Sequence, residues 1–271
     1  MTQTGLIDRI ITAMGLDDAN PKDTPSIFGT LIKDDNGEEC DEDFNHTSVL
    51  GMIIYIQGHT QPDISFAVNQ YARYAFGPRC SHEEAIKYIG RYLKGTGDKV
   101  IIMTPSMKLQ IDCYVDSDFS DLWNYEESTD PTSVKSRSFF LFTFGGYHIS
   151  GVSSLQSEIA LSTMEAEYIA MSVSMKDLVP LHCTVKTIIE AVDLDPKVQY
   201  ILKSKIWGDD ARALILVKLE PPRIALRSKH YALKYHWFRY KVKELSIRLN
   251  KIGAKDQLTD ILTKDLPKLD F

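Results

Sequence analysis

The sequence predicts an α/β protein in which a mostly α-helical segment precedes a mixed five-stranded sheet with flanking helices. Two observations support this class. Apolar side chains recur at helical spacing through the first hundred residues, and from about residue 98 they follow the shorter period of strands. From Leu109 onward, strand-like and helix-like stretches follow in the order β-β-β-α-β-α-α-β-α. Strands and helices mixed in this way pack as a sheet with helices on it.

Four helices are expected in the N-terminal part. The first covers residues 5–15 and ends at Gly15, because glycine readily adopts the backbone conformation that closes a helix. Further apolar helical stretches cover residues 47–57, 63–74 and 82–94. A polar, acidic stretch separates the first helix from the second, and its turn residues predict a loop.

The C-terminal part alternates between strands and helices. We expect strands at residues 99–104, 109–116, 137–144, 147–150, 198–207 and 245–252. The pair Gly145-Gly146 between two of these strands predicts a tight hairpin. Helices are expected at residues 162–192, at 210–219, around 231–245 and from about 255. Pro180 should interrupt the first of these helices, because proline removes a backbone donor.

Composition narrows the class of protein. The chain has 271 residues, 44% hydrophobic and 25% charged, which is ordinary for one or two globular domains. No apolar run reaches the roughly 20 residues of a membrane span, and no signal-peptide pattern opens the chain. Four widely spaced cysteines indicate reduced thiols and an intracellular setting, in the cytoplasm or nucleus. The net charge of −6 argues against strong autonomous binding to nucleic acid.

Four acidic residues stand out because each lies near the end or the start of a predicted element. They are Asp116 at a strand end, Glu167 early in a helix, Asp209 after another strand and Asp260 in the last helix. Such positions can converge on one edge of a sheet. Converging carboxylates repel one another, so a cluster of them persists mainly when it binds hard divalent cations. The pattern therefore predicts two-metal chemistry on phosphodiester bonds.

For two of these acids, a second acid lies two residues away, and spacing does not decide which of the two is the ligand. Asp118 shares the strand face of Asp116, because residues two apart in a strand point the same way. Glu165 and Glu167 point in different directions on a helix, yet both lie at similar angles from the predicted core stripe. Spacing alone leaves either member of each pair as the candidate ligand.

The other two acids have structural alternatives. Asp209 could cap the helix that begins near residue 210, a common role for aspartate. Asp260 could be a solvated helix residue, and Asp256 competes with it for the ligand role.

A basic, aromatic stretch runs from residue 223 to 251. Its aromatic and aliphatic residues fall at helical spacing and predict a buried stripe. Its cationic positions are the candidates for contact with phosphates, namely Lys229, His236, Arg239 and Lys243. A solvated helix face explains these residues equally well.

Several segments together resemble a known family. Residues 114–119 (Tyr-Val-Asp-Ser-Asp-Phe), 160–170 (Ala-Leu-Ser-Thr-Met-Glu-Ala-Glu-Tyr-Ile-Ala), 229–239 and 255–264 resemble the ribonuclease H region of copia-type retrotransposon polyproteins. Residues 3–11 resemble the end of the reverse transcriptase palm, and residues 61–70 and 91–96 resemble the thumb and connection that follow it. The resemblance covers nearly the whole chain in collinear order.

The resemblance implies a fold, a site and a substrate. It implies a truncated palm end, thumb and connection at residues 1–97 and a ribonuclease H-like domain at residues 98–271. It makes Asp116, Glu167, Asp209 and Asp260 the catalytic tetrad, which would hold two Mg²⁺ ions, or Mn²⁺ in their place. The expected partners are an RNA–DNA hybrid, whose RNA strand is cut, and the rest of a polyprotein. The sequence indicates no oligomer interface.

Departures from the family pattern qualify the expected activity. The polymerase Tyr-x-Asp-Asp turn has no counterpart here, so we expect no reverse transcriptase activity from this chain alone. Gly151 and Ser154 stand where relatives carry a tryptophan and a lysine. The alternative function is therefore a catalytically inactive remnant with at most nucleic-acid binding. An integrase is disfavoured because integrases place the glutamate last, and here it is second.

Overall fold

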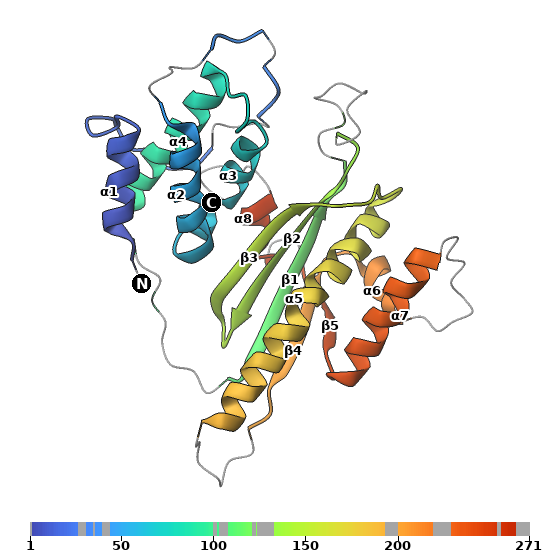
Figure 1. Ribbon diagram of the computed structural model, residues 1–271. Helices are drawn as coiled ribbons and strands as arrows, with labels where there is room; N and C mark the ends of the chain where they lie inside the picture. Colours follow the sequence, from blue (N-terminus) through green and yellow to red (C-terminus); the bar gives the residue numbers. More distant parts are fainter. Residues whose placement is uncertain are drawn as a thin grey trace. The chain divides into compact units, whose positions relative to one another are not determined.

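The computed structural model describes residues 2–26, 31–34, 36–39, 44–99, 102, 108–120, 123, 133–192, 200–218, 229–253 and 256–263. Backbone contacts divide the chain into two compact units. The first, the helical unit, comprises residues 1–103, 124–127 and 260–271. The second, the sheet unit, comprises residues 104–123 and 128–259. Both are drawn in Figure 1 and are described one at a time.

The helical unit contains the four helices that the sequence predicts. Its elements are α1 (Thr4–Ala13), α2 (His46–His59), η1 (Pro62–Ile64), α3 (Ser65–Ala72), α4 (Cys80–Thr96) and α8 (Asp260–Thr263). Gly15, with φ of +65°, follows the end of α1 as expected. The side chain of Asn45 caps α2 by accepting a hydrogen bond from the backbone of Ser48 at 2.9 Å. The short helix α8 packs against η1 and α3.

The sheet unit contains the predicted mixed sheet of five strands. They are β1 (Gln110–Asp118), β2 (Arg137–Phe144), β3 (Tyr147–Leu155), β4 (Lys203–Gly208) and β5 (Arg248–Lys251). Their order across the sheet is β3-β2-β1-β4-β5. The first three strands are antiparallel, whereas β4 runs parallel to both β1 and β5. Gly145 and Gly146 both have positive φ and close the β2–β3 hairpin.

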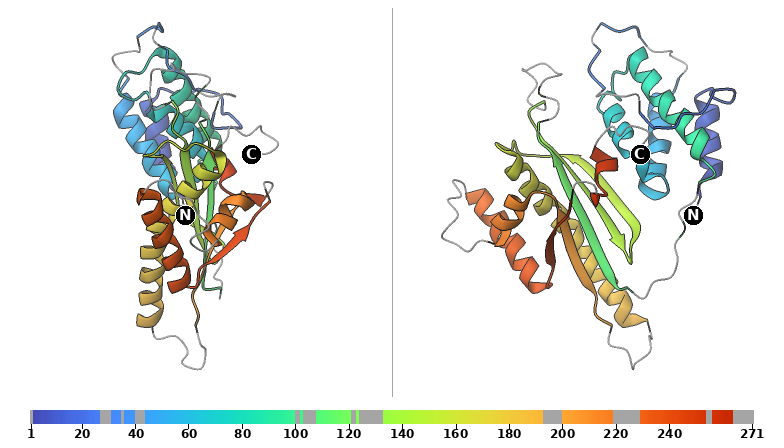
Figure 2. Two further views of the ribbon diagram at one scale, coloured as in Figure 1. Left: turned by 90° about the vertical axis from the view of Figure 1, so that its right-hand side faces the viewer. Right: turned by 180° about the vertical axis from the view of Figure 1, so that it is seen from behind.

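Three helices cover one face of this sheet. They are α5 (Thr163–Ala191), α6 (Ala211–Lys218) and α7 (Lys229–Glu244). The left view of Figure 2 shows the sheet edge-on, with α5 and α7 on the same side of it. Alternate residues of β1, namely Ile111, Cys113 and Val115, are fully buried in the core beneath these helices. Because strand side chains alternate, the even-numbered residues of β1, including Asp116, belong to the opposite face.

Several predicted boundaries differ from the structure. Pro180 does not interrupt α5, which continues from Thr163 to Ala191. Pro180 is exposed, so the carbonyl that loses its helical donor can be satisfied by solvent. The strand predicted at 245–252 is shorter, at Arg248–Lys251, because the chain turns after α7 ends at Glu244, and Ser246 in this turn has a φ of +51°. The strand predicted at 99–104 lies almost wholly outside the described residues. Among the residues described, no helix is long and apolar enough to cross a membrane.

Candidate metal centre

Three of the four predicted acids lie together in the sheet unit. Asp116, Glu167 and Asp209 each offer a carboxylate oxygen, and the three oxygens all lie within 4.8 Å of one another. Asp116 and Glu167 are buried, and Asp209 is half-buried. Buried carboxylates at this spacing repel one another strongly, so the arrangement calls for a proton or a cation between them.

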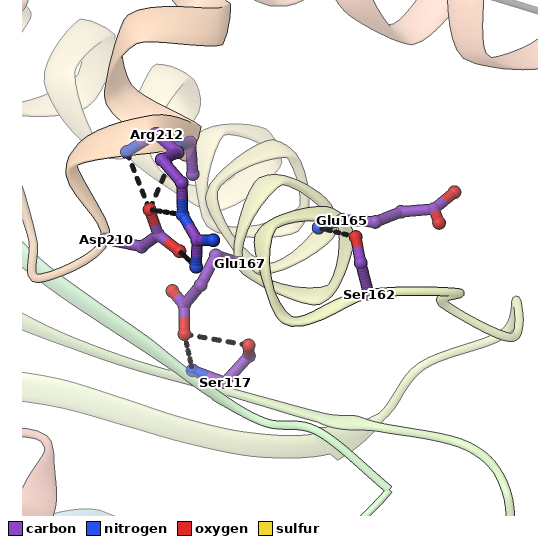
Figure 3. A network of polar contacts seen from close by, with 7 residues as sticks. Ser117, Ser162, Glu165, Glu167, Asp210 and Arg212 are labelled. Atoms are coloured by element: carbon purple, nitrogen blue, oxygen red, sulfur yellow. Dashed lines mark hydrogen bonds and ion pairs between the residues drawn. The ribbon is translucent and has the colours of Figure 1, made fainter.

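Strand register and helix position bring these acids together. Parallel pairing of β1 with β4 places Tyr114 beside Trp207. Two residues beyond that pair lie Asp116, on β1, and Asp209, just after β4. Glu167 lies in the second turn of α5 and approaches the end of β1 from the helix-covered face of the sheet, as Figure 3 shows. Adjacent parallel strands and one helix start thus build the site.

Glu167 is held by a residue that the sequence did not single out. Its Oε1 atom accepts hydrogen bonds from the backbone N–H of Ser117 at 2.9 Å and from the Ser117 hydroxyl at 2.8 Å. The only sequence signal for Ser117 was its place between two aspartates at a strand end. Burial first, and then the charge of Asp116, raise the pKa of Glu167 to about 8, although the Ser117 hydrogen bonds act in the opposite direction.

The neighbouring acids cap helices. The carboxylate of Glu165 accepts from the backbone of Leu161 at 2.8 Å, and Figure 3 shows it pointing away from Glu167. Asp210 accepts from the backbone N–H groups of Arg212 at 2.6 Å and Ala213 at 3.2 Å, so it caps α6. The capping role considered for Asp209 therefore belongs to the next residue. Glu165 and Asp210 are engaged in structure and are poor ligand candidates.

Asp118 lies beyond Asp116 at the end of β1. It is half-buried and stands opposite Arg137 in the register of β2. It does not belong to the group of three acids found among the described residues.

Asp260, the fourth predicted ligand, is the first residue of α8. It is half-buried, and α8 belongs to the helical unit. Asp260 is absent from the group of three acids identified among the described residues. Its rival Asp256 is exposed. The ligand role of Asp260 stays a prediction.

The predicted phosphate-contacting residues all lie on α7. His236 and Lys243 are exposed and Arg239 is half-buried, whereas the side chain of Lys229 lies outside the described residues. Phe238, a member of the predicted apolar stripe, is fully buried in the core. The stripe thus faces the sheet, and the role of the cationic residues stays a prediction.

The strand order, the flanking helices and the acids at the ends of β1 and β4 define a ribonuclease H-like fold. No protein-family model matches the chain. It is 32% identical to the Pol polyprotein of transposon TNT 1-94 from Nicotiana tabacum, over 100% of this chain and 19% of that protein. It is 28% identical to the Pol polyprotein of transposon RE2 from Arabidopsis thaliana, over 93% of this chain and 16% of that protein.

Copia-type retrotransposon Pol polyproteins are thus similar to this chain over 93–100% of its length, as its motifs predict, and the chain is consistent with their C-terminal reverse transcriptase and ribonuclease H region. It spans less than a fifth of the length of these two relatives. Among solved structures, LC11-RNase H1 isolated from compost is 12% identical, with 55% of this chain and 89% of that chain covered and a TM-score of 0.36.

Proposed function

We propose that this chain is a metal-dependent endonuclease that hydrolyses the RNA strand of RNA–DNA hybrids. The observation that supports the proposal most directly is the convergence of Asp116, Glu167 and Asp209 within 4.8 Å at one end of the sheet. A protein gains nothing in stability from holding three carboxylates so close, because their repulsion and desolvation both oppose folding. We infer that the cluster serves a bound cation.

The donor set fits Mg²⁺ or Mn²⁺. All three residues offer carboxylate oxygens, and no histidine or cysteine belongs to the group found among the described residues. Oxygen donors of this kind favour hard cations over zinc. Two such ions, when bound, would supply an activated water and charge stabilisation for the leaving 3′ oxygen. We propose Asp116 as the shared ligand and Asp260 as the fourth.

The chain's own residues have distinct tasks in this proposal. Ser117 fixes the orientation of Glu167 through its two hydrogen bonds, so that one carboxylate oxygen stays aimed at the cluster. Lys229, His236, Arg239 and Lys243 on α7 would contact the phosphates of the hybrid. Residues 1–97 would form the thumb and connection of a reverse transcriptase, residues 98–271 the ribonuclease H-like domain, and the rest of a polyprotein a further partner.

The deciding experiment is cleavage of a labelled RNA–DNA hybrid. The parent chain should cut the RNA strand in Mg²⁺ and lose activity in EDTA. Asp116→Asn should reduce cleavage to background, because it removes a charged ligand without changing the size of the side chain. Asp118→Asn, two residues away on the same strand, is the matched control and should retain activity. Equal cleavage by the parent and Asp116→Asn would contradict the catalytic role of Asp116, and no cleavage by the parent would favour the inactive remnant instead.

A further inference from the structure

A cavity lies in the sheet unit, close to the acids. Its volume is about 360 Å³, which is within the range of small-molecule pockets, roughly 300–1,000 Å³. Two aromatic residues of adjacent strands form one wall, and the chain that follows β5 forms the other. The residues that line it include Tyr114, Trp207, Lys251, Ile252, Asp256 and Leu258. All of them belong to the sheet unit.

The cavity is next to the proposed metal centre by strand geometry. Tyr114 precedes Asp116 by two residues on β1, so both side chains belong to the same sheet face, about 7 Å apart along the strand. Trp207 likewise precedes Asp209 by two residues at the end of β4. A nucleotide in the cavity would therefore be a neighbour of a phosphate held at the acids.

The aromatic wall is rigid. The rings of Tyr114 and Trp207 stack with centroids 6.1 Å apart and planes 12° apart. The indole N–H of Trp207 donates to Oδ1 of Asp112 at 2.8 Å, and the amide of Gln110 donates to the same carboxylate at 2.7 and 2.9 Å. This chain of hydrogen bonds fixes the indole plane before any ligand arrives. Both rings are half-buried and remain partly accessible.

The charges around the rings suit a nucleotide. The ammonium of Lys205 lies 5.4 Å from the centroid of the Trp207 ring. Lys251 is exposed at the cavity and can reach a phosphate, and the exposed carboxylate of Asp256 can accept from the amino group of a base. Aromatic rings beside lysines are the usual means of holding unpaired bases.

We propose that this cavity binds an unpaired nucleotide of a single-stranded RNA segment adjoining the hybrid, next to the bond to be cut. The inference rests on the proposed function and adds a substrate class to it, namely hybrids that continue into single-stranded RNA. A fully paired duplex would leave the cavity empty, because its bases stack on one another.

The fluorescence of Trp207 can report binding in the cavity. In Trp123→Phe/Trp237→Phe protein, Trp207 is the only tryptophan, since the chain has three. A hexamer of adenylate RNA should change its emission saturably. Lys251→Ala should weaken this binding several-fold at low salt. Lys176→Ala, which removes an exposed lysine from α5 on the other face of the sheet, should leave it unchanged. Fluorescence anisotropy of labelled RNA gives the affinity independently, and circular dichroism confirms folding.

Three results would overturn the proposal: no RNA binding, binding without a change in Trp207 emission, or equal weakening by the two lysine variants. The same titration in Asp116→Asn protein separates this inference from the proposed nuclease activity. Emission changes without any hybrid cleavage by the parent would contradict the nuclease activity alone. Cleavage without emission changes would contradict the nucleotide site alone.

Discussion

At the scale of single residues, Glu167 should make the stability of the metal-free protein depend on pH. Its pKa is about 8 in the folded chain against an ordinary value of 4.5. Between these values the folded state keeps a proton that the unfolded state releases. The contribution of Glu167 to the free energy of unfolding is therefore highest below pH 4.5 and falls as the pH rises from 4.5 to about 8, by up to ~1.4 kcal/mol per pH unit.

Urea unfolding at several pH values in EDTA measures this effect. Glu167→Gln should lose the decline, because its amide does not titrate. Glu165→Gln is the matched control two residues earlier on the same helix and should keep the decline, since Glu165 accepts a hydrogen bond from the backbone of Leu161 instead. A decline that persists unchanged in Glu167→Gln would assign it to another group.

Sequence reasoning could name these acids but could not separate each from its neighbour. Two glutamates two positions apart on α5 lie at similar angles from its apolar stripe, so helical periodicity does not distinguish them. The distinction arises from long-range packing, which places Ser117 of β1 against Glu167. Glu165 instead accepts a hydrogen bond from the backbone N–H of Leu161, just before the helix. Family resemblance favoured Glu167 because the motif carries that information.

At the scale of elements, two adjacent aspartates should behave differently when each is changed to alanine. Asp210→Ala removes the cap of α6 and should lower the free energy of unfolding by about 0.5–2 kcal/mol, leaving Mn²⁺ binding nearly intact. Asp209→Ala removes no cap. It should weaken Mn²⁺ binding and leave the metal-free protein as stable as the parent, or more so, because one repelling charge is lost.

Urea unfolding and Mn²⁺ titration followed by electron paramagnetic resonance measure both properties in the two variants. Loss of Mn²⁺ binding in Asp210→Ala with retention in Asp209→Ala would exchange the roles of the two residues.

The elements that the sequence predicted well are those with a strong local pattern. Alternating residues around Gly145-Gly146 predicted the β2–β3 hairpin, and helical spacing predicted the four N-terminal helices. The errors lie where tertiary packing overrides a local signal. Pro180 breaks the local rule for helices, yet α5 passes through it, because Leu178 and the rest of its apolar face stay buried against the sheet. The strand β3 was likewise predicted to end at residue 150, whereas its pairing with β2 extends to Leu155.

At the scale of the whole molecule, strand order is the property that local patterns could not supply. The order β3-β2-β1-β4-β5 places the ends of β1 and β4 side by side, although Asp116 and Asp209 are far apart in the sequence. The predicted convergence of the acids requires β1 and β4 to be neighbours in the sheet. The family resemblance implied this arrangement, and the parallel pairing of β1 with β4 shows it. The cavity at Tyr114 and Trp207 arises from the same pairing and had no sequence signal.

The division into two compact units gives the last prediction. Each unit has its own apolar core, so calorimetry in EDTA should resolve two unfolding transitions. In the proposed function, Mg²⁺ binds the folded acid cluster and not the unfolded chain. At 100 times its Kd it should therefore stabilise the sheet unit by about 2.7 kcal/mol. For a unit of this size that corresponds to a rise of roughly 5–10 °C in its Tm.

Variants of the acids test whether Mg²⁺ bound at the cluster causes this rise in Tm. Asp116→Asn should keep both transitions and lose the Mg²⁺-induced rise, while Asp118→Asn should keep it. A rise of equal size in these two variants would mean that Mg²⁺ binds elsewhere. Asp260→Asn in the same experiment tests the fourth predicted ligand, since a true ligand reduces the affinity for Mg²⁺ and hence the rise. An unchanged rise would exclude Asp260 and leave a centre of three carboxylates, in which Asp116, Glu167 and Asp209 hold the metal without help from α8.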